Sequence, residues 1–381
     1  MKIVHVCFSG PYIDNWGYQD NLLPQYLSDE GIENYVITGY DVFPSYLSKD
    51  KVEEINKKGM RYSIKNVNII RLRTRKLTTS LMVPYGLKQI LNKIKPDVIF
   101  HHGVNCTSLF ISAHYCKYNS CCRLFVDNHA DELNISKNKI WVSFYHKFLL
   151  KSTVKLIGKY VVKYYGVSVG RCNFLTKYYG INGEKVDLLP IGADTKASRD
   201  ISSKKLIREK YGFAADDMIV VSGGKMGISK GTDILINAIS DLNLEGRNIL
   251  LVLFGKFEDR ETEEMAEKYK FIKCYGWCDR KNTLELLKLG DIACWPIHHT
   301  TLIEDAVSVG TPLILRKTVT TEHLIDGNGF WINSDLSDLI KAFFDNNNIR
   351  NNTYRSANSM MTRLSYSSIV QKLIRDISAN I

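Results

Sequence analysis

The sequence lacks several features that would place the protein in other classes. No run of the roughly 20 apolar residues that a membrane-spanning helix needs occurs among its 381 residues. Its start, Met1 to Val6, reads as a buried strand and lacks the charged and then apolar pattern of a secretory signal. The nine cysteines contain no two matching spaced pairs, which favours reduced core thiols over disulfides or zinc ligands. We therefore expect a cytoplasmic protein.

Internal repeats, low-complexity tracts and the Gly-Lys-Ser/Thr element of a nucleotide-binding P-loop are also missing. Short runs rich in Val, Ile and Tyr alternate instead with longer amphipathic stretches, in two series separated by the polar segment 192–200. This alternation predicts strand-helix units that build two mostly parallel sheets. We expect an α/β fold with two Rossmann-like, doubly wound domains, at 1–195 and 205–362, and ligands bound where strands end.

Acidic residues are scarce in the first half of the chain. The formal net charge is +11, and residues 1–200 carry 28 Lys and Arg against 17 Asp and Glu, so the second half is neutral. Much of the excess lies at 61–100, where nine basic residues are opposed only by Asp97. The asymmetry predicts an anionic partner for the first half, either a membrane surface or a phosphate-bearing substrate. Without interleaved recognition motifs, we do not expect nucleic-acid binding.

A glycine-rich segment follows the predicted strand 218–222. It reads Gly-Gly-Lys-Met-Gly-Ile-Ser-Lys-Gly-Thr-Asp over 223–233 and leads into an apolar helix. Glycines let the backbone approach a ligand, and Lys225 and Lys230 can converge on one diphosphate near the helix start. The alternative, a glycine-rich turn with two solvated lysines, stays open from the spacing alone.

Five segments in order along the chain resemble motifs of the retaining family-4 glycosyltransferases, which have the GT-B fold. They are Pro-Asp-Val-Ile-Phe-His-His-Gly at 96–103, Leu-Leu-Pro-Ile-Gly-Ala-Asp-Thr at 188–195, the lysine segment at 225–233, Tyr-Gly-Trp at 275–277 and Asp-Ile-Ala-Cys-Trp-Pro at 291–296. Together they extend over nearly the whole chain. The resemblance implies two domains that face each other across a cleft, with a last helix at 363–381 that crosses back onto the first domain.

The resemblance also implies a donor site in the second domain. There Lys225 and Lys230 would bind the diphosphate, and backbone near Trp277 and Cys278 would bind the base. The family has two glutamates eight apart before Gly-Thr-Pro; counting back from Gly310 places Asp305 at the second, the ribose ligand, with Glu304 beside it as the other candidate. The first glutamate is missing. The donor sugar would then be held by other residues of this segment: His298, His299, Thr300 and Thr301. Two loop histidines without a role are the alternative.

In the first domain, the resemblance assigns two further positions to the cleft. Gly17 lies between the first strand and a helix, in the place of the glycine loop that closes over the donor phosphates. His129 follows the strand that ends at Phe125-Val126-Asp127 and would orient the donor sugar, while Asp127 and Asp131 would support it. A purely structural histidine is the alternative. We group His129, Asp127 and Asp131 as the catalytic set.

The sequence contains no Asp-x-Asp triplet, so the metal clamp of the other large glycosyltransferase fold is absent. Lysines and backbone donors would then stabilise the leaving diphosphate. We expect a metal-independent hexosyltransferase without a cofactor, and a UDP-sugar in preference to a GDP-sugar. The resemblance implies transfer to a hydroxyl of a glycan with retained anomeric configuration.

The acceptor is predicted from charge. Lys147, Lys151 and Lys155 have helical spacing beside apolar residues, which is typical of helices that lie on anionic lipid, although a solvated face would read the same way. We expect a lipid-linked glycan at the inner leaflet, in bacterial surface polysaccharide synthesis. The alternatives are a non-catalytic partner subunit of the same fold and a sugar-nucleotide epimerase.

Overall fold

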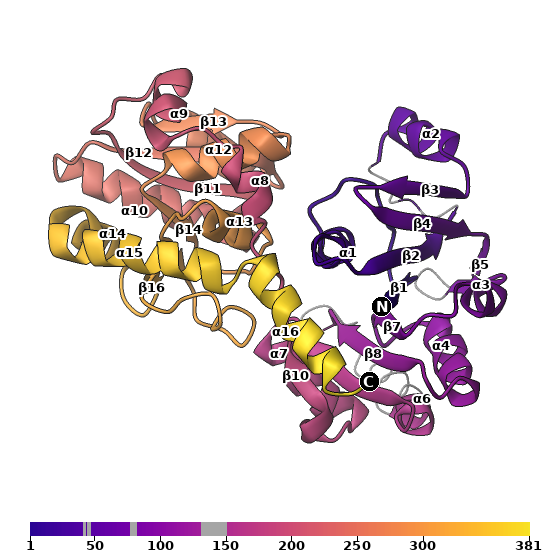
Figure 1. Ribbon diagram of the computed structural model, residues 1–381. Coiled ribbons are helices and arrows are strands. Elements are labelled where there is room, and N and C mark those ends of the chain that lie inside the picture. The colour runs from indigo at the N-terminus through magenta and orange to yellow at the C-terminus, as the bar shows by residue number, and fades with distance from the viewer. Residues whose placement is uncertain (41–42, 44–46, 77–81, 131–150) are drawn as a thin grey trace. The chain divides into compact units, whose positions relative to one another are not determined.

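The alternation of apolar strands and amphipathic helices produces two α/β units in the computed structural model (Figure 1). The structure describes residues 1–40, 43, 47–76, 82–130 and 151–381. Unit 1 contains Met1–Pro190 and Ile369–Ile381, and unit 2 contains Ile191–Ser368. The boundary lies a few residues before the division that we expected at 195–205. The segment 192–200 is more ordered than a polar linker, because it contains helix α8 (Thr195–Arg199), capped by Asp194, and the buried Ala193.

Unit 1 is built on an eight-stranded sheet in the order β10-β9-β8-β7-β1-β2-β4-β3. All neighbours are parallel except β3 and β4. The strands are β1 (Lys2–Cys7), β2 (Glu33–Gly39), β3 (Arg61–Ile64), β4 (Val67–Leu72), β7 (Val98–His102), β8 (Arg123–Asn128), β9 (Val161–Gly166) and β10 (Val186–Leu188). A separate hairpin pairs β5 (Thr74–Lys76) with β6 (Met82–Pro84).

Helices cover both faces of this sheet because its strands are apolar on both sides. One face packs against α3 (Leu87–Ile94), α4 (Thr107–Tyr118), α6 (Lys151–Ile157) and α7 (Val169–Tyr179), which share a core with β1, β7, β8 and β9. The element α1 (Gln19–Asp29) packs on β2, and α2 (Lys49–Lys57) precedes β3. The last helix, α16 (Tyr366–Ser378), begins in unit 2, and its residues from Ile369 onward belong to unit 1.

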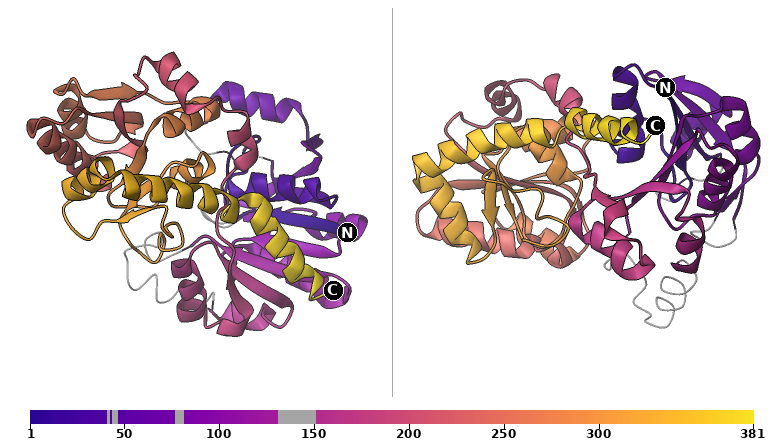
Figure 2. Two further views of the ribbon diagram at one scale, coloured as in Figure 1. Left: turned by 60° about the vertical axis from the view of Figure 1, so that its left-hand side comes forward. Right: turned by 60° about the horizontal axis from the view of Figure 1, so that its bottom comes forward.

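Side chains of α16 explain why it belongs to unit 1 over most of its length. Asp376 accepts hydrogen bonds from Lys163 and Tyr165 of β9, and Lys372 pairs with Asp187 of β10 at 2.5 Å. Only a short turn separates α16 from α15 (Asn347–Arg363), as Figure 2 shows.

Unit 2 has a six-stranded, fully parallel sheet in the order β13-β12-β11-β14-β15-β16. Its strands are β11 (Met218–Met226), β12 (Ile249–Phe257), β13 (Ile272–Tyr275), β14 (Ile292–Trp295), β15 (Leu313–Leu315) and β16 (Gly329–Trp331). The other helices are α9 (Lys204–Tyr211), α10 (Thr232–Leu244), α11 (Arg260–Glu267), α12 (Arg280–Leu289), α13 (Leu302–Ser308) and α14 (Leu336–Asp345). The prediction of two Rossmann-like units is therefore confirmed.

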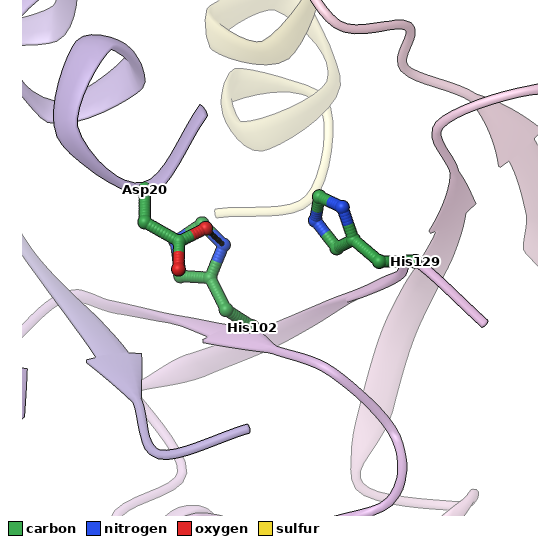
Figure 3. A group of neighbouring side chains, drawn as sticks. All are labelled: Asp20, His102 and His129. Atoms are coloured by element: carbon green, nitrogen blue, oxygen red, sulfur yellow. Dashed lines mark ion pairs between the residues drawn. The ribbon is translucent and has the colours of Figure 1, made fainter. Parts of the chain in front are cut away.

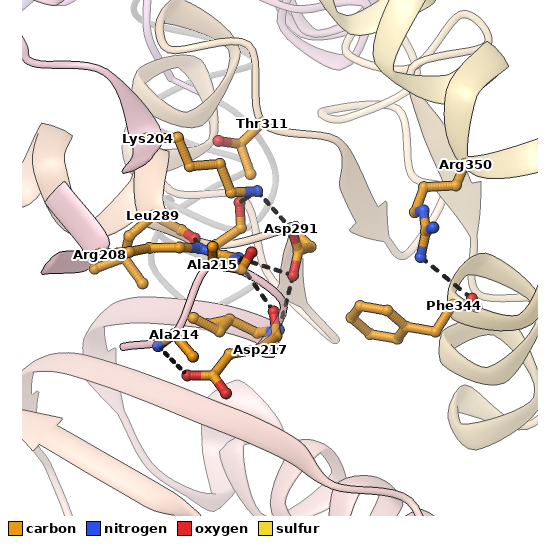
Figure 4. A network of polar contacts seen from close by, with 12 residues as sticks. Lys204, Arg208, Ala214, Ala215, Asp217, Leu289, Asp291, Thr311, Phe344 and Arg350 are labelled. Carbon is orange, nitrogen blue, oxygen red and sulfur yellow. Dashed lines mark hydrogen bonds and ion pairs between the residues drawn. The ribbon is translucent and has the colours of Figure 1, made fainter. Parts of the chain in front are cut away.

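A buried polar network fixes α9 and α15 to the start of β14 (Figure 4). Asp291 accepts from Lys204 at 2.6 Å, from Arg208 at 3.0 Å and from the Ile219 amide at 2.9 Å. Tyr354 of α15 donates to the same carboxylate. Burial opposes the charge of Asp291, but Lys204 and Arg208 outweigh it and lower the pKa of this carboxyl. These contacts join α9, α15 and β11 to the start of β14, which is a structural role.

All nine cysteines are free thiols. In the part of the chain that the structure describes, no helix has the length and apolar character needed to cross a bilayer.

Candidate functional site

Three adjacent strands of unit 1, β1, β7 and β8, carry ionisable side chains at or next to their carboxyl ends, and Figure 3 shows His102 and His129 from this region beside Asp20. In the parallel register, His102 at the end of β7 lies between Cys7 of β1 and Asp127 of β8. Nδ1 of His102 is 2.8 Å from Oδ2 of Asp127, and both side chains are fully buried. His129, just beyond β8, points its Nε2 at the same oxygen from 3.3 Å. Asp127 therefore lies between two histidines.

A hydrogen-bond chain determines the protonation of His102. The amide nitrogen of Asn34 donates to the Ile32 carbonyl and the Ser28 hydroxyl, so its oxygen accepts from Nε2 of His5, 3.2 Å away. Nδ1 of the neutral His5 must then accept from Nε2 of His102, at 3.1 Å. Because Nδ1 of His102 also donates to Asp127, both ring nitrogens of His102 carry protons.

The electrostatics of the cluster agree with this assignment. Burial alone would lower the pKa of His102, but the adjacent Cys7 sulfur and the carboxylates of Asp127 and Asp20 raise it well above its ordinary value. Burial and the His102 charge lower the pKa of His5, which stays neutral. Burial opposes ionisation of Asp127, but the positive His102 and the neighbouring His129 outweigh it, and the pKa of this carboxyl falls. The result is a buried imidazolium-carboxylate pair.

His129 is the exposed residue that contacts this pair through Asp127. Its side chain is 39% exposed, whereas Asp127 is inaccessible, and Arg171 holds the His129 carbonyl at 3.0 Å. When Nε2 donates to Asp127, Nδ1 of the neutral ring is left as a hydrogen-bond acceptor. The arrangement can therefore accept a hydrogen bond from, or take a proton from, a bound hydroxyl.

Ligand atoms of Asp20, His102 and His129 also lie within 4.8 Å of one another, a grouping that could hold a metal ion. Asp20 is 3.3 Å from Nδ1 of His102. A doubly protonated imidazole has no lone pair for a metal, so the hydrogen-bond chain favours an ion pair. The expectation of no metal stays a prediction.

Two other residues predicted for unit 1 are not joined to this cluster by any described contact. Gly17 is exposed in the bend before α1. Asp131 lies outside the described residues, as does Lys147 of the predicted basic helix face.

In unit 2, a pocket of about 200 Å³ lies at the carboxyl end of β11. It is lined by Gly223, Lys225, Lys230, Trp295, His298, His299 and Thr300. Five predicted donor residues thus meet in one cavity: both lysines, both histidines and Thr300. Trp295, from β14, donates its indole N–H to the Gly223 carbonyl at 3.0 Å and so fixes the wall of the pocket.

The lysine segment differs from the predicted turn, because β11 continues through Gly223 and Gly224 to Met226. Lys225 is therefore at the end of a strand, where its side chain is 73% exposed and 3.3 Å from Glu258. Lys230 is the last residue of the tight turn Ile228–Lys230, and Gly231 follows it with a φ of +75°. A Cβ at Gly231 would lie 2.8 Å from Ile297, so only glycine allows this close approach.

Glu304 and Asp305 of α13 have different surroundings. Nε2 of His299 is 2.8 Å from Oε1 of Glu304, which connects Glu304 to the pocket. Its Oε2 is buried without a hydrogen-bond partner among the described residues. Burial opposes the charge of Glu304, but His299 outweighs it and lowers the pKa of this carboxyl. Such a carboxylate can accept a further hydrogen bond.

Asp305 is paired with Arg280 at 2.5 Å, and Arg280 is also 3.5 Å from Asp194. Burial raises the pKa of Asp305, against the opposing charge of Arg280. One of its oxygens is thus already occupied. Of the remaining predicted residues, Thr301 precedes α13, Trp277 is 84% exposed in the loop after β13, and Cys278 donates to the Gly276 carbonyl.

The site residues predicted from the sequence did not include His102, His5, Asp20, Arg280 or Trp295. The sequence contained a signal for His102, because this residue lies in the 96–103 segment at the end of a predicted strand. The next strand along the chain carries Asp127. No sequence motif indicated Arg280, because its role depends on the packing of α12 against α13.

Residues 203–360 match the family model Glycosyl transferases group 1. Unit 2 thus carries a domain of this family, and the resemblance is confirmed there, whereas the family-4 subtype stays a prediction. The D-inositol 3-phosphate glycosyltransferase of Xylanimonas cellulosilytica is 24% identical over 172 residues, which span 41% of this chain and 41% of that protein.

Solved structures resemble the chain over its full length. The Anabaena Alr3699/HepE protein in complex with UDP has a TM-score of 0.71 at 14% identity, with 100% of both chains covered. A glycosyltransferase from Rickettsia africae has a TM-score of 0.70 at 16% identity, over 100% of this chain and 99% of that one. These similarities establish the two-unit GT-B fold of the chain.

Proposed function

We propose that the protein is a retaining glycosyltransferase that moves a hexose from a UDP-sugar to a hydroxyl of a glycan acceptor. The observation that carries the proposal is the pocket of unit 2, where Lys225 and Lys230 meet two histidines at the end of β11 inside the glycosyl transferases group 1 domain. A pocket of about 200 Å³ with two cations at its wall suits a diphosphate.

The roles in unit 2 follow from these surroundings. The two lysines stabilise the charge that develops on the leaving diphosphate, which is the largest contribution in such a reaction. His298, His299 and Thr300 orient the donor sugar at the pocket wall. Glu304 offers the ribose a free carboxylate oxygen, while Asp305 offers only the oxygen that Arg280 leaves. Trp277 is exposed enough to stack on the base.

The role of unit 1 is to receive the reacting groups. His129 accepts a hydrogen bond from the sugar or the acceptor hydroxyl through Nδ1. Asp127 and the imidazolium of His102 hold that ring in one tautomer. Gly17 leaves room for the phosphates near the start of α1. Lys225 and Lys230 balance the negative charge of the diphosphate, so the transfer needs no metal ion and no cofactor.

UDP is the preferred nucleotide, and the solved complex of the Anabaena relative with UDP supports this choice. The acceptor is a glycan on a lipid diphosphate, in the synthesis of a bacterial surface polysaccharide, and the protein works in the cytoplasm at the inner leaflet. The positive charge of the first half of the chain supports an anionic acceptor side.

The test is incubation of the purified protein with a panel of UDP- and GDP-hexoses. We expect slow release of UDP from one UDP-sugar, and no release from the Lys225→Ala/Lys230→Ala variant. With a glycan acceptor added, the anomeric configuration of the new glycosidic bond, read by NMR, decides retention. A C2-epimerised donor would identify an epimerase instead. Absence of any turnover, together with tight binding to another transferase, would identify a non-catalytic subunit.

A further inference from the structure

Three helices on one face of unit 1 carry no acidic residue. They are α3, α4 and α6, which pack over the same core and appear together at the edge of this unit in Figure 1. Within their bounds they contain Lys88, Lys93, Lys117, Lys151 and Lys155, and no Asp or Glu. Five cations without a carboxylate give this face a single sign of charge.

The same helices expose large apolar side chains as well as burying others. Phe110 and Tyr118 of α4 are 40% and 67% exposed, Leu156 of α6 is 68% exposed, and Tyr85, just before α3, is 56% exposed. Their inward-facing residues, such as Leu91, Leu109 and Ile157, already fill the core. The outward set is therefore not needed to fold the unit, and it costs solvation free energy in water.

A groove of about 640 Å³ runs between these helices. Phe110, Ile111, Leu156 and Tyr160 line it, together with Lys88, Lys117 and Lys159, and none of its lining residues is acidic. No carboxylate in the described part of the chain forms an ion pair with these three lysines; Lys117 and Lys159 instead lie 5.0 and 5.1 Å from the rings of Tyr118 and Tyr160. The ammonium groups thus surround an apolar floor.

We propose that the α3/α4/α6 face of unit 1 docks on an anionic lipid bilayer, with the groove against the acyl-headgroup boundary and Lys88, Lys117 and Lys159 on the headgroup phosphates. Aromatic side chains beside lysines are the composition that suits this boundary. A soluble acidic protein would satisfy the lysines but would leave the apolar floor without a partner. A nucleic acid would do the same. The proposal deepens the proposed function, on which it rests for the lipid-linked acceptor.

Co-sedimentation of the full chain with vesicles tests the proposal. Vesicles with 30% phosphatidylglycerol in phosphatidylcholine should bind the protein, and pure phosphatidylcholine should bind it far more weakly. Each lysine near an anionic surface is worth about fivefold in partitioning, so Lys88→Gln/Lys117→Gln/Lys159→Gln should weaken binding about 100-fold. The matched control, Lys268→Gln/Lys270→Gln/Lys273→Gln, removes three exposed lysines of unit 2 and should bind like the wild type.

A reporter at Leu156 tests the apolar half of the proposal. In Leu156→Trp, the emission of the new indole should shift to the blue on phosphatidylglycerol vesicles, and brominated acyl chains should quench it. Phe110→Ser should weaken binding without changing its dependence on salt. Both variants keep the inward core residues and should fold normally.

The proposal is overturned if the triple glutamine variant binds as well as the control, if binding ignores lipid charge, or if double-stranded DNA binds more tightly than the vesicles. Release of UDP from the donor without vesicles separates this failure from failure of the proposed function. A triple variant that still hydrolyses donor but does not bind vesicles supports the docking face. A protein that binds vesicles in the predicted way but never releases UDP retains the docking face and loses the transferase assignment.

Discussion

The polar groups at the strand ends of the two units are organised in opposite ways. In unit 1, His5, His102, Asp127 and His129 are bonded to one another, and only His129 reaches solvent substantially. In unit 2, Lys225 and Lys230 stand at an open pocket, and the ion pair that they form within the described part of the chain, between Lys225 and Glu258, is exposed. A closed network fixes the orientation of one side chain, whereas open cations leave their charge available to a ligand. The difference suggests that unit 1 positions a reacting group and unit 2 binds an anion.

The largest effect is expected from removing the open lysines of unit 2, which tests whether this unit binds an anion. Each charge-assisted contact is worth about 1.5 to 3 kcal/mol, so Lys225→Ala/Lys230→Ala should lower kcat/KM by about 10²- to 10⁴-fold. Steady-state release of UDP measures this loss. Lys268→Ala/Lys270→Ala, two exposed lysines of the same unit, should leave kcat/KM unchanged. Equal turnover of the two double variants would show that the open lysines do not bind the donor.

Asp127→Asn tests whether the closed network positions His129. The amide keeps the shape but removes the charge that faces His102 and His129, and it leaves the more exposed Asp20 as the carboxylate beside the imidazolium. We expect kcat to fall about 100-fold, as for the loss of a positioned general base, with KM little changed. The circular dichroism spectrum and the melting temperature report whether the variant is folded. A folded variant with normal kcat would make the network a purely structural feature, like that around Asp291.

Asp305→Asn separates the two carboxylates of α13. Because Arg280 already occupies one oxygen of Asp305, the free oxygen of Glu304 should contribute more to ribose binding. We expect Asp305→Asn to raise the Kd for UDP only a few-fold, and Glu304→Gln to raise it about tenfold, the value of one hydrogen bond to a charged group. Isothermal titration calorimetry with UDP checks the order. The reverse order would return the ribose to Asp305, as the motif alignment indicates.

The pH dependence of stability should show the smallest effect. The raised pKa of His102 gives a contribution that is complete below about pH 6.5 and is lost as the pH rises through the folded value. The lowered pKa of Asp127 gives one that is present above about pH 3.9 and is lost as the pH falls through the folded value. On the alkaline side, the wild type should therefore lose up to about 1.4 kcal/mol per pH unit between about pH 6.5 and the raised folded pKa of His102.

Urea unfolding of wild type and His102→Gln across pH 6 to 10 measures this slope for unit 1. Between about pH 6.5 and 8, below the range in which the buried thiols contribute, the variant should lack this loss, and His114→Gln, on an exposed histidine, should keep it. Nitrogen NMR of labelled histidine gives a direct reading, since both ring nitrogens of His102 should be protonated at pH 7. A single protonated nitrogen would contradict the hydrogen-bond chain.

The amino-acid sequence was sufficient to predict the two series of strands and helices, the lysine segment and the difference in net charge between the two halves. These properties depend on local periodicity and composition, which can be read without knowledge of packing. The spacing of the glycine-rich segment indicated Lys225 and Lys230, and the family resemblance indicated His298 and His299. The structure brings all four to one pocket. The docking face was anticipated from the charge excess and from the helical spacing of Lys147, Lys151 and Lys155, of which Lys147 falls outside the described residues.

The hydrogen-bond and ion-pair partners of each ionisable side chain depend on the tertiary structure. The sheet register places His102 against Asp127, although 25 residues separate them, and the chain of donors from Asn34 protonates His102 on both nitrogens. Because α12 packs against α13, Arg280 forms an ion pair with Asp305. Oε2 of Glu304 has no hydrogen-bond partner among the described residues. Strand order and helix contacts join residues that are distant in the chain, and hydrogen-bond direction and desolvation exist only once those contacts form. For this reason the protonation states, and with them the division of roles between the two units, could not be read from the sequence.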